Sequence, residues 1–267
     1  MTTPLMAEAL EIAKSLALEA GGIIANNLSV GKQVDFKGVV DPVTSIDRQC
    51  EDLILAGLRD AFPAHGIVAE ETGGRATESG PCWYVDPIDG TCNFVHSLPH
   101  CAVSIAQFVD GRPQVAVVYD PSRNELYEAQ NGDGARCNGN GIRVSSSARL
   151  DRSLLVTGFP YDRRDKSAFY LAYFEAFLCR AQDLRRLGSA ALDLCWVACG
   201  RFEGFFEWGL QPWDTAAGWL ILREAGGTVT DFRGHGYDPS GRSILASNGL
   251  IHQQCLEVLH TVSAAER

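Results

Sequence analysis

Apolar residues along the chain recur with two different periods, and each period predicts a different kind of element. Over residues 5–27, small and apolar side chains return every three or four positions, which predicts an amphipathic helix. A second helix is predicted from Thr44 to about residue 61, because Thr44 and Asp47 are spaced like a capping box. The chain therefore begins with two predicted helices.

Two short strands are predicted next, and both end directly in acidic residues. The strand at 66–69 is followed by Glu70 and Glu71, and the strand at 83–85 is followed by Asp86. A carboxylate at a strand end projects from a rigid sheet edge, which is a good place to fix the geometry of a ligand.

Between residues 102 and 144 the pattern changes to an antiparallel meander. Its strands are separated by turn signals at 110–113, 120–122 and 131–134. The later predicted strands lie at 154–157, 204–207, 227–230 and 243–246, and the later predicted helices at 166–181, at 189–198, from Pro212 to Gly226-Gly227, and from about Leu250. Alternating helices and strands predict an α+β or α/β fold of stacked layers. A soft boundary near residue 150 would separate an N-terminal part, 1–150, from a C-terminal part, 151–267.

The composition is that of an ordinary globular protein. The chain has 267 residues, of which 46% are hydrophobic, 9% aromatic and 21% charged. No apolar run reaches the roughly 18 residues that a membrane span requires. The N-terminus lacks the basic stretch and apolar core of a signal peptide. We therefore expect a cytoplasmic protein without a membrane partner.

The charge balance limits the classes of partner. The 33 Asp and Glu residues outnumber the 23 Lys and Arg residues by ten, which argues against broad nucleic-acid binding. An anionic substrate is still allowed, because bound cations can invert the local field. A phosphate-handling protein with this charge should therefore carry metal.

The nine cysteines have no paired spacing and are expected to be reduced thiols, mostly buried. Cys195 and Cys199 lie four apart, but no second Cys or His pair is spaced to complete a zinc site.

The chemistry that stands out is acidic. The candidate acids are Asp41, Asp47, Glu70, Glu71, Asp86, Asp89 and Asp214. Asp86 and Asp89 flank a Pro-Ile step, and Pro87 stiffens the turn by fixing its own φ. Both carboxylates can then face one point, with the Ile88 carbonyl as a further oxygen ligand. An all-oxygen set selects a hard cation such as Mg²⁺.

Gly90 and Thr91 should open a short helical turn directly after these acids. Exposed N–H groups at a helix start favour an anion, and glycine lets a phosphate approach the backbone. Simpler alternatives stay open at this point. Asp214 would also complement the dipole of the helix that Pro212 opens, and Asp47 would also serve as a cap. The Glu70-Glu71 pair would also fit a solvated strand end, and the segment 86–91 an Asp-rich turn or a calcium loop.

Taken together, four segments closely resemble the inositol monophosphatase family. They are Asp41-Pro42-Val43-Thr44-Ser45-Ile46-Asp47, Ala69-Glu70-Glu71, Trp83-Tyr84-Val85-Asp86-Pro87-Ile88-Asp89-Gly90-Thr91-Cys92-Asn93-Phe94 and Pro212-Trp213-Asp214-Thr215-Ala216-Ala217-Gly218. The segments 185–194 and 224–227 are similar to the bacterial branch. The resemblance covers nearly the whole chain, in order and with compatible spacing.

This resemblance implies a layered αβαβα sandwich of the inositol monophosphatase and fructose-1,6-bisphosphatase type, usually a homodimer. It also implies Mg²⁺-dependent activity, with two or three ions per site, that Li⁺ often inhibits. Carried over by position, Glu70, Asp86 and the Ile88 carbonyl would hold the first ion. Asp86, Asp89 and Asp214 would hold the second, so that Asp86 bridges the two.

The resemblance further assigns the remaining roles. Asp47 with Thr91 would orient the nucleophilic water, assisted by a third, weaker ion near Glu70. The backbone of Gly90 and Thr91 would bind phosphate. The residues implied at the hydroxyls of the leaving alcohol are Glu207, Gly188, Ser189 and Ala190.

Two positions depart from the family pattern. Cys92 stands where the family commonly has Thr or Ser. It is either a small residue that the position tolerates or a thiol beside the phosphate loop that makes the activity sensitive to oxidation. Gln211 stands where animal enzymes have His, which weakens the case for inositol contacts there. His96 and His100 are not expected to be ligands, since Pro99 disturbs any helix joining them.

The expected reaction is direct attack of a metal-activated water on phosphorus, without a phosphoenzyme. Asn93-Phe94 and Glu207 favour a small phosphorylated polyol, myo-inositol monophosphate first. Alternative substrates are fructose 1,6-bisphosphate, histidinol phosphate, 3′-phosphoadenosine 5′-phosphate and NADP. Two other classes remain: a regulatory protein that binds a partner on the same fold, and a calcium-stabilised structural module.

Overall fold

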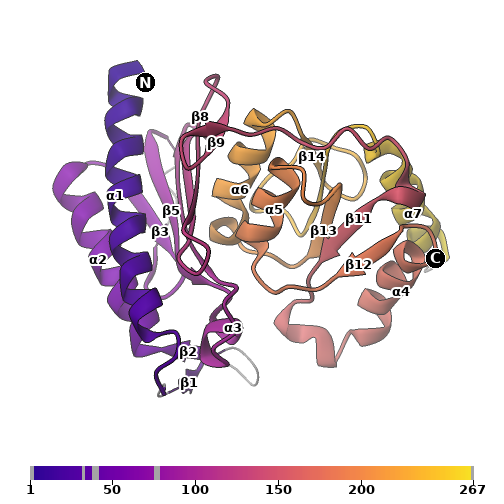
Figure 1. The fold of residues 1–267 in the computed structure, drawn as a ribbon, viewed down its shortest axis with the longest axis horizontal. Coiled ribbons are helices and arrows are strands. Elements are labelled where there is room, and N and C mark those ends of the chain that lie inside the picture. The colour runs from indigo at the N-terminus through magenta and orange to yellow at the C-terminus, as the bar shows by residue number, and fades with distance from the viewer. Residues whose placement is uncertain (1–2, 32–33, 38–41, 75–78, 266–267) are drawn as a thin grey trace.

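Layers of helix and sheet alternate across the molecule (Figure 1). The computed structural model describes residues 3–31, 34–37, 42–74 and 79–265. The helices are α1 Thr3–Asn27, α2 Ser45–Ala61, α3 Thr91–Val95, α4 Ser167–Leu178, α5 Ala190–Ala198, α6 Pro212–Glu224 and α7 His252–Ala265, with short 3₁₀ turns at Leu150–Arg152 and Tyr161–Arg164. The candidate residue Asp41 lies outside the described residues.

The strands form two large sheets and one hairpin. An eight-stranded sheet has the order β10-β9-β8-β7-β6-β5-β3-β4, a five-stranded sheet has the order β12-β11-β13-β15-β14, and β1 pairs with β2. The strands are β1 Val34–Phe36, β2 Pro42–Thr44, β3 Gly66–Ala69, β4 Gly73–Gly74, β5 Pro81–Asp89, β6 Ala102–Val109, β7 Arg112–Asp120, β8 Glu125–Gln130, β9 Ala135–Cys137, β10 Asn140–Gly141, β11 Leu154–Thr157, β12 Asp183–Arg185, β13 Gly204–Trp208, β14 Thr228–Thr230 and β15 Ser243–Ser247.

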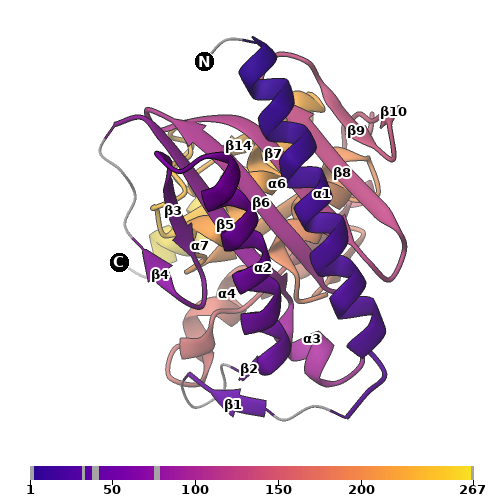
Figure 2. The same ribbon diagram turned by 90° about the vertical axis from the view of Figure 1, so that its left-hand side faces the viewer.

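Three hydrophobic clusters hold the layers together. One lies between the eight-stranded sheet and α1 with α2, which cross its outer face (Figure 2). A second lies between the two sheets around α5 and α6, and a third lies between the five-stranded sheet and α4 with α7. Neighbouring strand residues serve different clusters: Phe205 belongs to the second and Phe206 to the third. This is the two-residue period of strands that are covered on both faces.

The predicted layered α/β class is confirmed by this arrangement and by the solved structures compared below. The meander is also present, as β6 to β10 pair antiparallel in sequence order. The division into parts at residue 150 stays a prediction. The eight-stranded sheet comes entirely from residues before this point, and the five-stranded sheet entirely from residues after it.

One local prediction needs correction, and some strands were not predicted. The stiff turn expected at Pro87 is instead part of β5, which pairs with β3 up to Val85 and runs on beside β6 to Asp89. Its register against β6 shifts between Asp86 and Asp89, and this irregularity accommodates a proline that has no N–H for the ladder. The strand β12, which was not predicted, forms because Leu184 is buried against β11 at the edge of the sheet.

Helix α2 begins as predicted. The Thr44 side chain accepts hydrogen bonds from the backbone N–H groups of Ile46 and Asp47, and the Asp47 carboxylate accepts one from the Thr44 N–H at 2.8 Å. This capping box fixes where Asp47 stands at the helix start. No helix in the described part of the chain combines the length and the apolar content needed to cross a bilayer.

Candidate active site

A cavity of about 420 Å³ gathers the predicted site residues from distant parts of the chain. Its lining includes, of the predicted set, Glu70, Asp86, Ile88, Asp89, Gly90, Thr91, Gly188, Ser189, Ala190, Glu207 and Asp214. These residues come from the ends of β3 and β5, the start of α3, the segment before α5, the strand β13 and the first turn of α6. Asp47 reaches the same place through Thr91, whose hydroxyl oxygen lies 3.0 Å from Asp47 Oδ1.

The end of β5 and the start of α3 form the floor of the cavity. The Thr91 hydroxyl oxygen also lies 3.0 Å from the Ile88 carbonyl oxygen, and the Ile88 N–H donates to Asp86 Oδ1 at 3.0 Å. Gly90 has φ +97°, and a Cβ there would come within 3.0 Å of the His100 carbonyl oxygen and 3.1 Å of that of Gly188. Only glycine therefore suits the step from Asp89 to the helix.

Each acid has a different set of protein partners. Asp89 Oδ2 accepts hydrogen bonds from the Ser189 hydroxyl at 2.6 Å and the Ala191 N–H at 2.7 Å. Asp214 Oδ2 accepts one from the Gln211 N–H at 2.7 Å, so Asp214 caps its helix and faces the cavity at once. The capping role that the sequence left open is thus real, and it does not exclude a second role.

Glu70 and Glu71 share one cation. Lys37 Nζ lies 2.9 Å from Glu70 Oε1 and 2.6 Å from Glu71 Oε1. Glu70 lines the cavity, whereas Glu71 does not. The turn that carries both is held from α2, because the buried Glu51 carboxylate accepts hydrogen bonds from the backbone N–H groups of Glu71 and Thr72.

The electrostatics of the acids favour a bound cation. Burial raises the pKa of Asp86 well above its usual range, and the neighbouring Glu70, Asp89 and Asp214 raise it further. Burial also raises the pKa of Asp89 to about 6, against the opposing hydrogen bond from Ser189. Close carboxyl groups cannot all stay ionised without positive charge between them. The atoms that these acids offer as metal ligands are all oxygens, which suits a hard divalent cation.

Among the described residues, the acidic side chains do not form a complete metal-coordination sphere. In the described part of the chain, no three His, Cys, Asp or Glu side chains stand so as to hold a metal ion without adjustment. Glu70 is turned towards Lys37, and Asp89 is turned towards Ser189 and α5. The chemistry of these oxygen ligands fits a magnesium site.

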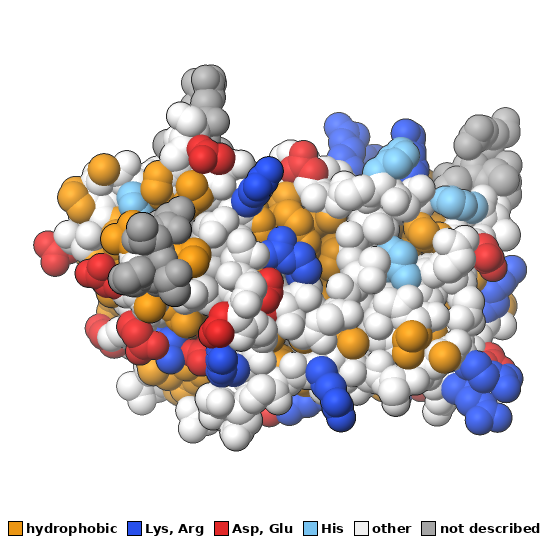
Figure 3. Space-filling model, turned by 90° about the horizontal axis from the view of Figure 1, so that it is seen from above, with side chains coloured by type: hydrophobic (Ala, Val, Ile, Leu, Met, Phe, Trp, Pro, Cys, Tyr) orange, Lys and Arg blue, Asp and Glu red, His pale blue; other side chains and the backbone are white. Residues whose placement is uncertain are grey.

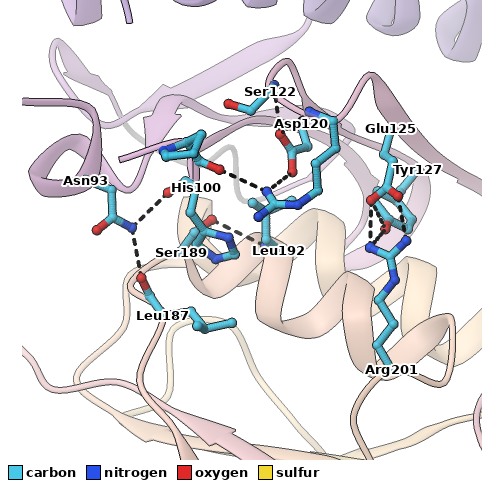
Figure 4. A network of polar contacts seen from close by, with 12 residues as sticks. Asn93, His100, Asp120, Ser122, Glu125, Tyr127, Leu187, Ser189, Leu192 and Arg201 are labelled. Atoms are coloured by element: carbon cyan, nitrogen blue, oxygen red, sulfur yellow. Dashed lines mark hydrogen bonds and ion pairs between the residues drawn. The ribbon is translucent and has the colours of Figure 1, made fainter. Parts of the chain in front are cut away.

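Asn93 ties together two of the chain segments whose ends line the cavity. Its amide nitrogen lies 2.8 Å from both the His100 and the Leu187 carbonyl oxygens, which links α3 to the segment before α5 (Figure 4). Gly188, with φ +91°, then turns the chain into α5, whose N-cap is Ser189. Neither His96 nor His100 lines the cavity, and burial lowers the pKa of His100 to about 4.

Several cavity residues were missed by the sequence analysis. They are Lys37, Gly158, Phe159, Pro160, Tyr161, Arg163, Arg186, Asp193, Gly209, Leu210 and Trp213. Gly158 leaves room for Glu207, since a Cβ there would come within 2.2 Å of Glu207 Oε2. Arg186 and Asp193 belong to the 185–194 segment quoted for the resemblance and could have been found there. Lys37 and Arg163 carried no signal, and they show that the cavity is less purely acidic than the net charge of −10 suggests.

Comparison with known proteins gives one consistent result. The family model described as "Inositol monophosphatase family" matches residues 5–264. "Nus factor SuhB" of Salmonella typhimurium is 46% identical over 243 residues, which cover 90% of this chain and 91% of that protein. "Inositol-1-monophosphatase" of Synechocystis is 45% identical over 252 residues, which cover 94% and 88%. The solved structure of an inositol monophosphatase from Anabaena superposes with a TM-score of 0.88 at 40% identity, covering 96% of each chain.

Proposed function

The chain belongs to the inositol monophosphatase family, and we propose that it hydrolyses a phosphate monoester with the help of Mg²⁺. The observation that carries this proposal is the meeting of four acids, the Ile88 carbonyl and the Gly90-Thr91 helix start in one cavity. The first candidate substrate is myo-inositol monophosphate. Its alternatives are fructose 1,6-bisphosphate, histidinol phosphate and the nucleotide phosphates.

Glu70, Asp86, Asp89, Asp214 and the Ile88 carbonyl would hold the two or three ions proposed. Magnesium bound there would neutralise charge on the phosphate and make water a better nucleophile. The buried carboxylates have a reason to be together in that case, because without cations their mutual repulsion destabilises the fold.

Asp47 and Thr91 are suited to orient the attacking water. Asp47 is fixed by the Thr44 backbone N–H and by the Thr44 hydroxyl, both within 2.8 Å of its Oδ2. Its other oxygen, Oδ1, accepts from the Thr91 hydroxyl at 3.0 Å. While Thr91 donates to Asp47, its lone pairs point elsewhere and accept a hydrogen bond from water. Burial raises the pKa of Asp47, which makes it a better proton acceptor than an exposed acid.

The two ends of the substrate would meet different walls. The first backbone N–H groups of α3 have no acceptor within a helix of this kind and would be available to phosphate oxygens. The leaving alcohol would face Glu207 and the segment Gly188–Ala190 across the cavity.

The proposal is tested by phosphate release over a panel of inositol, sugar, histidinol and nucleotide phosphates, with and without Mg²⁺ and Li⁺. Wild type should require Mg²⁺, be inhibited by Li⁺ and prefer inositol phosphate. Asp89→Asn should lose nearly all turnover while its circular dichroism spectrum stays close to that of wild type. Full activity of Asp89→Asn would show that the assignment is wrong.

A second candidate function is favoured by the names of the relatives. Proteins called "Nus factor SuhB" are 46% identical over nine-tenths of this chain, so a role through a macromolecular partner is the main alternative. On the face seen in Figure 3, basic side chains are scattered among acidic and polar ones and form no continuous basic patch. The net charge of −10 likewise favours a protein partner over direct binding of nucleic acid.

The two functions separate in one genetic experiment. In a strain that lacks the gene, Asp89→Asn should fail to restore the phenotype if the phosphatase reaction matters. Full complementation by this variant would favour the partner-binding role. The proposed homodimer is checked separately, by sedimentation of the purified chain.

A further inference from the structure

Asn93 is a buried polar residue of α3 to which the proposed chemistry assigns no role. It is 8% exposed, and it is not among the residues that line the cavity. Its amide nitrogen lies 2.8 Å from both the His100 and the Leu187 carbonyl oxygens (Figure 4) and 3.4 Å from the Gly188 carbonyl oxygen. Carbonyl oxygens only accept hydrogen bonds, so this place in the fold requires a side chain that donates more than one.

The carbonyl oxygens around the Asn93 amide also enclose Gly90. A Cβ on Gly90 would come within 3.0 Å of the His100 carbonyl oxygen and 3.1 Å of the Gly188 carbonyl oxygen. Gly188 therefore packs directly against the residue from which α3 begins. Because Gly90 and Gly188 both line the cavity, this contact sets the separation of two of its walls. The amide of Asn93 fixes the contact from inside the protein.

The two walls differ in what else supports them. The start of α3 has a support of its own, because the Thr91 hydroxyl lies 3.0 Å from Asp47 Oδ1. The segment 187–191 is held at its later residues by Asp89 and at its first two residues by Asn93. Loss of the Asn93 amide should therefore move the beginning of this segment more than the start of α3.

We propose that Asn93 is a positioning residue, which holds the wall Gly188–Ala190 at a fixed separation from the start of α3 and so places the leaving alcohol relative to the phosphate. This inference rests on the proposed phosphatase function, in which the phosphate binds at the start of α3 and the alcohol faces that wall. Asn93 acts only by holding the two walls together, since it does not line the cavity. Such an effect is large enough to measure, because a misplacement of about 1 Å can cost about 100-fold in rate.

The test compares recognition of the whole substrate with recognition of phosphate alone. With Mg²⁺ present, kcat/KM is measured for myo-inositol 1-phosphate and the inhibition constant Ki for inorganic phosphate, on wild type, Asn93→Ala and Asn93→Asp. In Asn93→Ala, kcat/KM should fall by about ten-fold, because two carbonyl oxygens lose their donor. In Asn93→Asp it should fall by about 100-fold, because a carboxylate of the same size sets acceptors against those carbonyl oxygens. Ki should stay within about two-fold of wild type, because the contact of Thr91 with Asp47 is an independent support.

The matched control is Asn140→Asp. Asn140 is an exposed residue of β10, at the edge of the eight-stranded sheet, and its amide donates to the Asn138 carbonyl oxygen. The same chemical change there should leave both constants unaltered. If circular dichroism shows that Asn93→Asp does not fold, Asn93→Ala carries the comparison.

The possible outcomes separate this inference from the proposed function. A fall in kcat/KM with an equal rise in Ki would assign Asn93 a purely structural role, and an unchanged kcat/KM in a folded variant would mean that the amide does not set the wall. Either result overturns the inference and leaves the phosphatase assignment standing. Wild-type protein that releases phosphate from no ester overturns the proposed function itself, and the inference with it.

Discussion

Removing the Ser189 hydroxyl should loosen α5 from Asp89 and lower the stability of the metal-free protein. The hydroxyl donates to Asp89 Oδ2 at 2.6 Å, and a hydrogen bond to a charged group contributes about 1.5–3 kcal/mol. The same hydroxyl caps α5, but the Leu192 N–H is 3.5 Å away, so the cap contributes only about 0.5 kcal/mol. Because the Ala191 N–H still holds Asp89 in Ser189→Ala, the lower end of the range applies. We expect a loss of about 2 kcal/mol, or about 4–8 °C in Tm for a chain of this size.

The assay is equilibrium unfolding in denaturant at pH 8 without Mg²⁺, where an Asp89 with a pKa of about 6 is ionised. Wild type, Ser189→Ala, Asp89→Asn and the double variant form a double-mutant cycle, which should give a coupling of about 1–2 kcal/mol between the two sites. Ser15→Ala, at an exposed serine of α1, is the control and should change stability by less than about 0.5 kcal/mol. Additive effects of the two substitutions would refute the reasoning, because they would mean that the hydroxyl and the carboxylate do not interact.

Three further predictions follow from other parts of the fold. Burial lowers the pKa of His252 from 6.5 to about 4, so its neutral form stabilises the protein fully above pH 6.5. This contribution, at most about 3 kcal/mol, is lost as the pH falls towards 4. Unfolding curves measured against pH should therefore show that His252→Gln loses less stability in acid than wild type. In thermal melts, Gly218→Ala should destabilise the protein by about 1–3 kcal/mol, because a Cβ there would lie 2.6 Å from a side-chain carbon of α5. Its control, Gly22→Ala, has nothing within 4 Å of the new Cβ and should stabilise the protein by up to about 1 kcal/mol. Glu51→Gln should raise the Mg²⁺ concentration needed for half-maximal activity about ten-fold, because Glu51 holds the turn that carries Glu70, a proposed Mg²⁺ ligand. The control Asp52→Asn, at the exposed neighbouring residue, should leave this concentration unchanged.

The interpretation of two acids of the site as helix caps is correct but incomplete. Asp214 caps its helix through Gln211, and Asp47 takes part in a capping box, as the local alternatives stated. Both acids nevertheless reach the cavity, Asp214 directly and Asp47 through Thr91. The cap fixes the rotamer of each acid through its Oδ2, while Oδ1 of Asp47 accepts from the Thr91 hydroxyl, so capping and a role at the cavity are compatible at these positions.

The amino-acid sequence by itself determined the local elements and the identity of the acids. The capping box of Thr44 and Asp47 was readable because its partners lie three residues apart, and a helix start depends on such short-range hydrogen bonds. The resemblance to the family rested on segments whose order and residue types are visible without coordinates. The Pro87 step was predicted as a stiff turn but lies in β5, because the pairing of Asp86 and Asp89 with β6 is a property of the sheet and not of the segment.

Only the tertiary structure decided which groups face one another across the cavity. The contact of Lys37 with Glu70 joins residues 33 positions apart, and the hydrogen bond of Ser189 to Asp89 joins residues 100 apart. In the sequence Asp193 is one residue of the segment 185–194, and only folding buries its Oδ1 without a hydrogen-bond donor among the described residues. How deeply a residue is buried depends on what packs around it, and burial sets the energy of a charge or of an unpaired oxygen. The packing partners come from other layers of the fold, which the local sequence does not specify.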